Sequence, residues 1–318
     1  MSQVTVIIVT YNSSDHIERC IERCRPMPVI VVDNASSDDT LERVRRYPDV
    51  RLIANRENIG FAAAVNQAVA ATDSPFLLLL NPDVELETPV DGLIEACSRP
   101  GVGIAAGLLR DAQGKIQTGF TARRFPTAAM LGAEVLGLNR VFPRNRWNRA
   151  YRYLDRNLTE GGEVDQPAGA LLLFRRDVWA ELGGFDERFS PVWFEDVDFC
   201  RRARDLGYRA MLIPGVHAKH AGGHSIATLD WECRERYWYV SLLKYVSKHF
   251  TPWQSRKVGA AVVLGSFIRA VIGTLQKRSW RPIPVYLRVI RLACVCLWSG
   301  RAGKDKPAAG KMAVNMQQ

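Results

Sequence analysis

The sequence predicts an α/β fold with a mostly parallel central sheet, because strand-like and helix-like stretches alternate near its N-terminus. Val4 to Thr10 is an uninterrupted run of apolar and β-branched residues, which is typical of a strand buried on both faces. Further strands are expected at 29–32, 51–54 and 76–80, with helices between them at 17–24, 39–47 and 60–71. A sheet of this kind binds ligands at the carboxyl ends of its strands.

Polar residues follow each of these four expected strands. Any one such stretch would be an ordinary turn, because Asn, Asp and Gly dominate turns. Four of them at one edge of a sheet indicate a ligand site instead. In chain order they are Thr10-Tyr11-Asn12, Asp33-Asn34, Asn58-Ile59-Gly60 and Asn81-Pro82-Asp83.

A second group of polar residues lies between 190 and 225. An acidic cluster, Glu195, Asp196 and Asp198, follows the aromatic pair Trp193-Phe194 and begins a stretch with helical periodicity. A short strand at 210–213 is expected to stop at Pro214-Gly215, which places three histidines in a loop. A carboxylate beside aromatic rings can accept a proton, and an imidazole nearby can bind a metal ion. The alternative is that the acids simply suit the N-terminal dipole of a helix and that the histidines are surface residues.

The positive charge of the chain is concentrated at its C-terminal end. Residues 234–318 hold 16 Lys and Arg against 2 Asp and Glu, a balance of +14 within a net charge of +10 for the whole chain. This imbalance indicates a phosphate-rich partner for the C-terminal segment. The seven cysteines have no paired CxxC spacing, so we interpret them as reduced thiols.

Six stretches of sequence resemble the family 2 inverting glycosyltransferases of the GT-A fold. They are VIIVTYNSS, VIVVDNASSDDT, NIGFAAAVNQA, LLLLNPDVEL, GALLLFRRDVWAELGGFDERF and WFEDVDFCRRARDLGYR, and the match runs from about residue 3 to residue 226. The chain is most similar to bacterial rhamnosyltransferases that act on polyprenyl-linked sugars. The resemblance implies transfer of a sugar, with L-rhamnose from dTDP-rhamnose as the best candidate, to a polyprenyl-diphosphate-linked saccharide during synthesis of a cell-envelope polysaccharide.

The resemblance also implies roles for individual residues. Asp196 matches the general base, Asp83 and His220 match ligands of Mg²⁺ or Mn²⁺, and His217 and His224 remain alternatives to His220. The donor would be bound by Thr10, Tyr11, Asn12, Asp33, Asn58, Gly60, Asn81 and Asp83. The acceptor would be bound by Trp193, Phe194, Glu195, Gly169 and Ala170. The basic, aromatic residues 120–160 are expected to form a mobile loop, which could contact the acceptor diphosphate or be merely solvated.

The C-terminal third is expected to differ from the catalytic domain, placed at 1–230. Residues 231–300 should form a helical extension and residues 301–318 a disordered tail. Apolar segments at 258–275 and 282–298 are interrupted by arginines, as in helices that lie on an anionic membrane surface. The alternative is a pair of helices packed on the catalytic domain. We expect a peripheral protein at the cytoplasmic face of the inner membrane.

Two other functions compete with this interpretation. A processive polysaccharide synthase using a UDP-hexose would carry a Gln-x-x-Arg-Trp motif, for which QKRSW at 276–280 is a poor match. A non-catalytic nucleotide-binding regulator or nucleic-acid binder would explain the basic C-terminal segment. It would leave Asp83, Asp196 and His220 without a task, so we expect no nucleic acid among the partners.

Overall fold

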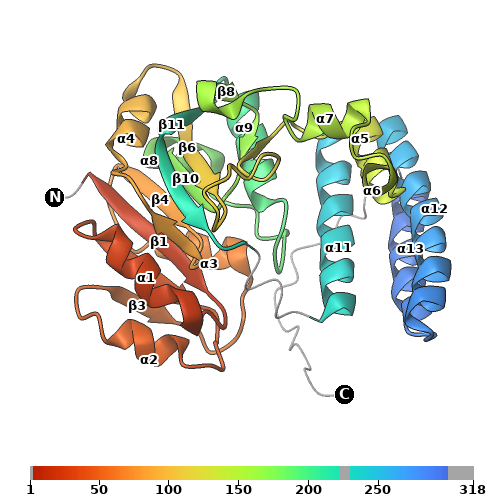
Figure 1. Cartoon of the computed structure of the whole chain (residues 1–318), viewed down its shortest axis with the longest axis horizontal. Coiled ribbons are helices and arrows are strands. Elements are labelled where there is room, and N and C mark those ends of the chain that lie inside the picture. Colours follow the sequence, from red (N-terminus) through yellow and green to blue (C-terminus); the bar gives the residue numbers. More distant parts are fainter. Residues whose placement is uncertain (1–2, 223–229, 300–318) are drawn as a thin grey trace.

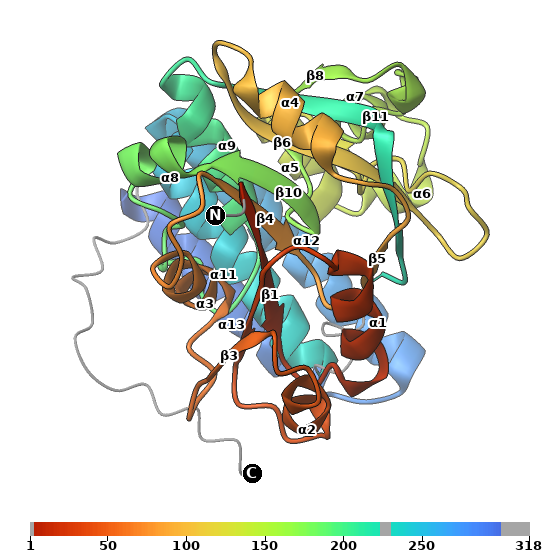
Figure 2. The same cartoon turned by 90° about the vertical axis from the view of Figure 1, so that its left-hand side faces the viewer.

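The computed structural model describes residues 3–222 and 230–299. It has two regions that stand side by side, a central sheet with its helices and a bundle that contains the C-terminal helices (Figure 1). Viewed from the sheet side, the strands lie in front of this bundle (Figure 2). We call the bundle the helical region; it consists of α5–α7 and α11–α13.

The first four strands are parallel, as the sequence predicts. Their order is β3-β2-β1-β4, and they span β1 Val4–Thr10, β2 Val29–Asp33, β3 Arg51–Ala54 and β4 Phe76–Leu80. The helices between them are α1 Ser14–Cys24, α2 Thr40–Arg45 and α3 Phe61–Val69. Every residue of β1 is buried, because apolar side chains cover both faces of the sheet. The four polar turns therefore end parallel strands, which brings them to one edge.

The second half of the sheet is mixed. Strand β10 (Leu171–Arg175) runs antiparallel between β4 and β6 (Val102–Arg110), and β11 (Arg209–His220) then lies parallel to β6. Short strands complete the edges, namely β5 Val84–Leu86 and β8 Gly162–Val164, and a separate two-stranded sheet pairs β7 Ala122–Arg123 with β9 Gln166–Pro167. The remaining helices of this region are α4 Asp91–Ser98, α8 Arg176–Leu182 and α9 Glu195–Asp205.

Strand β11 corrects the prediction that a strand ends at Pro214 and that His217 and His220 lie in a loop. The strand continues to His220, and its pairing with β6 shifts register between Leu212 and His217. A proline is tolerated at such an irregularity because its missing N–H interrupts no regular ladder hydrogen bond there.

Residues 120–160 also differ from the expected mobile loop. They contain α5 Ala128–Val135, α6 Leu138–Val141, α7 Arg146–Tyr151 and a turn of 3-10 helix, Leu158–Glu160. Thr127 and Asn145 begin α5 and α7 as side-chain caps, accepting the backbone N–H of Met130 and Asn148. Buried Leu131 and Val135 of α5 belong to the same apolar core as the C-terminal helices, which fixes this segment in place.

The C-terminal extension is helical, with α11 Trp231–His249, α12 Pro252–Lys277 and α13 Pro282–Ser299. Its inner side packs with α5 and with Phe189 and Phe194 of the segment before α9. The outer side of α12 exposes large apolar residues, among them Phe267 at 62% and Leu275 at 72% of their surface. Within the described residues, α12 alone is long and apolar enough to cross a membrane, and only 28% of that stretch is buried. The predicted tail at 301–318 lies outside the described residues.

Candidate active site

The ends of β1 and β2 form a preorganised polar edge. The Asp33 carboxylate is fully buried and accepts hydrogen bonds from Thr10 Oγ1 (2.9 Å), Ser36 Oγ (2.5 Å) and the Ser36 backbone N–H (2.9 Å). Asn12 has a left-handed backbone (φ 51°), and its side-chain oxygen accepts the backbone N–H of Ser37 (2.8 Å). Asp33 therefore fixes the two adjacent turns against each other, with Tyr11 partly exposed beside them.

The turn before α3 closes the same edge. Gly60 lies next to Asn58, whose side-chain oxygen accepts the Gly60 N–H (3.0 Å), and Asn58 itself is exposed. Gly60 has φ +88°, and a Cβ there would lie 2.9 Å from Ser190 Oγ. Glycine is needed for both reasons. The backbone of Phe61 donates to the Pro191 carbonyl (2.8 Å), so this turn contacts the segment that leads into α9.

Two backbone contacts connect the turn Asn81-Pro82-Asp83 to Asp196. The Asn81 N–H donates to the carbonyl of Ala170 (3.1 Å), and the neighbouring Gly169 N–H donates to Asp196 Oδ2 (3.0 Å). Residues 169–170 thus link the backbone of Asn81, two residues before Asp83, to the carboxylate of Asp196. The turn that carries Asp83 and the carboxylate of Asp196 therefore contact two adjacent residues of the chain.

Asp83 and His220 face each other across this end of the sheet. Both are nearly buried, at 7% and 1% exposed, and His220 Nε2 lies 3.6 Å from Asp83 Oδ2. Two ligands of one Mg²⁺ at about 2.1 Å from the ion cannot be more than roughly 4.2 Å apart, so the pair is close enough to share a metal ion.

The surroundings of His220 fix its orientation. Gln117 Nε2 donates to the His220 carbonyl (2.9 Å), which leaves Gln117 Oε1 to accept the proton of His220 Nδ1 (2.8 Å). His220 Nε2 then carries a lone pair, and this buried nitrogen has no hydrogen-bond partner in the described structure. The ring stacks on Phe120 (4.7 Å between centroids), and burial lowers the pKa of His220 despite the opposing charge of Asp83. A neutral imidazole aimed at a carboxylate is suited to metal binding. Among the described residues, no third His, Cys, Asp or Glu joins the pair.

Asp196 occupies the first turn of α9 and is partly exposed. Its Oδ1 accepts the Val197 N–H (2.8 Å) and its Oδ2 accepts that of Gly169, so each oxygen keeps a free lone pair. Burial raises the pKa of Asp196 above its usual value, although these hydrogen bonds and the charge of Arg123 lower it in part. A partly exposed carboxylate with a raised pKa is suited to accept a proton.

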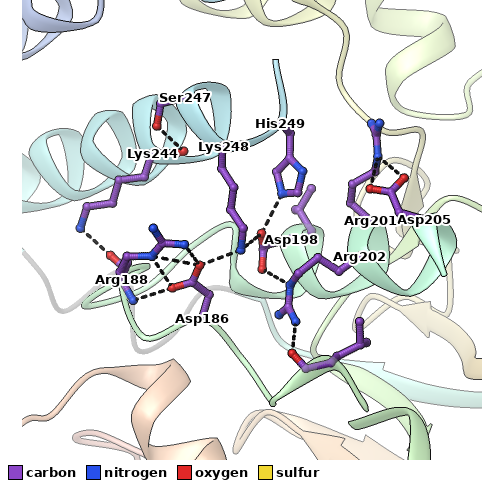
Figure 3. Close-up of polar contacts among 12 residues, drawn as sticks. Asp186, Arg188, Asp198, Arg201, Arg202, Asp205, Lys244, Ser247, Lys248 and His249 are labelled. Carbon is purple, nitrogen blue, oxygen red and sulfur yellow. Dashed lines mark hydrogen bonds and ion pairs between the residues drawn. The ribbon is translucent and has the colours of Figure 1, made fainter. Parts of the chain in front are cut away.

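Glu195 and Asp198 flank Asp196 but are both buried. Burial, and then the negative charges of Asp196 and Asp198, raise the pKa of Glu195 well above its usual value, and Glu195 Oε2 has no partner in the described part of the chain. Asp198, by contrast, is surrounded by partners (Figure 3). It contacts Arg202 (2.7 Å), Lys248 (2.6 Å) and His249 (2.7 Å). Burial would raise its pKa, but the hydrogen bond from His249 and the charges of Arg202 and Lys248 lower it.

Two consecutive residues before α9 have left-handed backbones, Trp193 (φ 78°) and Phe194 (φ 72°). Such conformations cost roughly 1–3 kcal/mol each and are concentrated at functional sites. Phe194 is buried against Tyr245 (5.4 Å between centroids), whereas Trp193 is partly exposed. Trp193 is therefore available to a ligand, and Phe194 packs in the core of the helical region.

Two of the three histidines that the sequence offered as metal ligands are not shown beside Asp83. His217 lies beside Glu87 (3.7 Å) rather than Asp83, and His224 lies outside the described residues. Sequence reasoning missed Gln117 and Phe120, which orient His220, and Lys248 and His249, which bind Asp198. No local motif marks these four residues, because each acts across a long sequence separation.

The order of parallel strands, with a polar edge and an acidic turn at their carboxyl ends, is that of the GT-A fold. A mannosyltransferase, PcManGT from Pyrobaculum calidifontis, solved in complex with GDP-Man and Mn²⁺, superposes with a TM-score of 0.53 at 20% identity. The match covers 93% of this chain and 87% of that protein, and it supports the fold.

The chain belongs to glycosyl transferase family 2, whose sequence model matches residues 5–183. It is 34% identical over 239 residues to the N-acetylglucosaminyl-diphospho-decaprenol L-rhamnosyltransferase of Mycobacterium tuberculosis, over 69% of this chain and 76% of that protein. It is also 23% identical over 266 residues to rhamnosyltransferase WbbL of Escherichia coli K12, over 77% and 95% of the two chains. These matches confirm the predicted family and its similarity to rhamnosyltransferases.

Proposed function

We propose that this chain is an inverting, metal-dependent rhamnosyltransferase that moves L-rhamnose from dTDP-rhamnose to a polyprenyl-diphosphate-linked saccharide. The observation that carries the proposal is the short path from the turn Asn81-Pro82-Asp83 through Ala170 and Gly169 to Asp196. This path supports a role for Asp83 and His220 as metal ligands at the donor and for Asp196 as the proton acceptor of the second substrate. The choice of rhamnose and of a lipid-linked acceptor rests on the two similar rhamnosyltransferases.

Asp196 would act as the general base. The acceptor hydroxyl attacks the anomeric carbon from the face opposite the leaving group, its proton passes to a free lone pair of Asp196, and the bond from C1 to the phosphate oxygen breaks. The nucleoside diphosphate departs with the electron pair, so the configuration at C1 inverts. General-base catalysis of this kind typically contributes 10²–10⁴-fold.

Asp83 and His220 would hold Mg²⁺ or Mn²⁺. When bound, such an ion neutralises charge on the departing diphosphate. The 3.6 Å separation and the unpartnered His220 Nε2 fit this role, and the diphosphate and water would supply the remaining ligands. Gln117 and Phe120 would keep the imidazole aimed at the ion.

We propose that the outer face of α12 and α13 docks on an anionic membrane, where a polyprenyl acceptor resides. Large apolar residues are exposed there, and exposed basic residues, including Arg256, Lys257, Arg288 and Arg291, lie on the same two helices. Each basic residue near an anionic leaflet contributes about 1 kcal/mol. Docking in the membrane plane would give a peripheral protein on the cytoplasmic face, and the composition of α12 makes a span the competing arrangement.

A donor and acceptor panel tests the proposal directly. dTDP-rhamnose, UDP-glucose and UDP-galactose would each be offered with a short-chain prenyl-diphospho-N-acetylglucosamine, with Mn²⁺ or excess chelator. We expect rhamnose transfer with the α,β configuration at C1 reversed, and a loss of turnover in chelator. Transfer from a UDP-hexose instead would overturn the choice of donor, and full turnover in chelator would overturn the metal site.

The metal ligands can be tested without turnover. Calorimetric titration of Mn²⁺ in the presence of dTDP should show tight binding to the wild type and weak binding to Asp83→Ala and His220→Ala. His217→Ala is the matched control, because its ring contacts Glu87 and lies on the same strand. Equal loss in the control would argue against the assignment of His220.

A further inference from the structure

A cavity of about 270 Å³ lies between the segment before α9 and the helical region. We call it the Trp193 cavity. Three helices contribute to it, α5, α11 and α12. The lining residues are Glu134, Trp193, Arg234, Glu235, Trp238 and Arg269.

Most of the charged groups in this lining are already held by the protein. Glu134 accepts from Arg152 (3.1 Å), and Glu235 accepts from the Tyr286 hydroxyl (3.2 Å). Arg269 donates to the backbone carbonyls of Val135 and Glu134 at the end of α5. Arg234 differs, because it is exposed and no hydrogen bond or ion pair holds its guanidinium within residues 3–222 and 230–299.

We propose that the Trp193 cavity binds a sugar residue of the acceptor. Two arginines and two glutamates balance in charge, so the lining has no net attraction for a diphosphate. It offers both donors and acceptors, which a sugar hydroxyl requires because it is itself donor and acceptor. The two tryptophans supply apolar ring faces with a polar N–H at the edge, which suit a pyranose with one apolar face. The inference rests on the proposed glycosyltransferase function and deepens it.

The cavity is within reach of the proposed base. Trp193 precedes Asp196 by three residues, so their Cα atoms lie at most about 11 Å apart. Trp193 and Phe194 both have left-handed backbones, and their side chains point to different places. Phe194 lies in the core of the helical region, and Trp193 lines the cavity. A saccharide held against Trp193 would therefore lie close enough for a neighbouring sugar unit to reach Asp196.

This placement assigns a second task to the helical region. Arg234, Glu235 and Trp238 all come from α11, so this helix would help to select the acceptor sugar as well as bracing α9. Among the described residues, none that lines this cavity comes from a strand of the sheet. Specificity for the acceptor would then be separable from specificity for the donor.

The test measures acceptor binding without donor, using the intrinsic tryptophan fluorescence of the full chain or calorimetry. The probes are short-chain prenyl-diphospho-N-acetylglucosamine and the same prenyl diphosphate without sugar. The wild type should bind the sugar-bearing probe more tightly. Arg234→Gln should weaken that probe roughly tenfold or more, the fold-change expected on losing a charged hydrogen bond, and leave the sugar-free probe unchanged.

Arg236→Gln is the matched control, because Arg236 is also exposed on α11 but lies over the Tyr237 ring (5.0 Å) and not in the cavity. It should change neither affinity. If Arg234→Gln weakened both probes equally, the cavity would be a diphosphate site and the proposal would be overturned. The proposal would also be overturned if Arg234→Gln had no effect on either affinity, or if the wild type bound the two probes equally well. Failure of rhamnose transfer with these binding differences intact would instead reject the proposed function.

Discussion

The buried carboxylates of the sheet edge and those of α9 are held in different ways. Asp33 is surrounded by hydroxyl and backbone N–H donors from turns close to it in the fold, and no cation within the described residues donates to it. Asp198 contacts two cations, Arg202 and Lys248, and the ring of His249; Lys248 and His249 come from the end of α11. The Asp33 contacts are therefore formed within the turns of the sheet edge, whereas α9, which carries the proposed base, is also held by a distant helix.

The largest expected effect tests whether Asp196, and not the neighbouring Glu195, is the general base. Asp196→Asn should lower transfer 10²–10⁴-fold, because the amide cannot accept a proton, and should leave dTDP binding nearly unchanged. Turnover and calorimetric donor binding would be compared with those of Glu195→Gln. If Asp196→Asn kept most of the rate while Glu195→Gln lost it, the base assignment would be wrong. In the wild type, the acid limb of kcat/KM should lie above the usual range of an aspartate, because the raised pKa of Asp196 keeps it protonated to higher pH.

The dependence of α9 on α11 is tested by a stability measurement. Asp198→Ala should destabilise the fold by about 3–5 kcal/mol, because it removes the buried carboxylate that Arg202, Lys248 and His249 all contact. Asp205→Ala, on the same helix, removes an exposed pair with Arg201 and should cost about 0.5 kcal/mol or less (Figure 3). Urea unfolding would give both values, and equal effects would contradict the comparison.

The pH dependence of the Asp198 effect has a definite sign. Its pKa is lower in the folded chain than in the unfolded chain, so its contribution is present above the unfolded value of about 3.9 and is lost as the pH falls through the folded value. The difference between the wild type and Asp198→Ala should therefore shrink in acid.

The outer face of the helical region provides a smaller effect. Phe267→Ser combined with Leu275→Ser should weaken binding to anionic vesicles roughly tenfold or more, since each buried large apolar side chain contributes about 1.5–3 kcal/mol. Leu206→Ser, at an apolar residue that is 51% exposed just beyond the end of α9, should not change it. Vesicle sedimentation at low and high salt would measure this. Binding that ignores anionic lipid and salt would reject membrane docking.

The smallest effect concerns Glu195, whose carboxyl, unlike that of Asp198, contacts no cation in the part of the chain that the structure describes. Its folded pKa lies above the unfolded value, so ionisation of Glu195 costs stability as the pH rises above about 4.3. Glu195→Gln should therefore stabilise the fold at pH 7, by about 1 kcal/mol, and the gain should vanish near pH 4. Thermal unfolding at the two pH values would decide, and a loss of stability at pH 7 would show that the charged form is favoured.

The contrast between contacts made within nearby turns and contacts made across the chain also explains what could be predicted from the sequence. The four parallel strands and their polar turns follow from local patterns, because each turn ends a strand whose direction the α/β alternation already determines. The Asp83–His220 pair could be predicted only in part. The sequence indicated His220 as a candidate ligand, but it did not indicate that β11 continues past Pro214, through a register shift, to place His220 on a strand. Contacts such as Gln117 with His220 join residues 103 apart, and no local period or spacing encodes them.

Helix α11 spans 19 residues, about 28 Å at the usual rise, and its two ends touch different parts of the enzyme. Arg234 lies near its start, and Lys248 and His249 lie at its end against Asp198. This has a consequence for engineering by chimaeras. A junction placed between α9 and α11 would give the catalytic helix of one parent the counter-charges of another, so grafts meant to alter acceptor choice should exchange residues 190–299 as one unit.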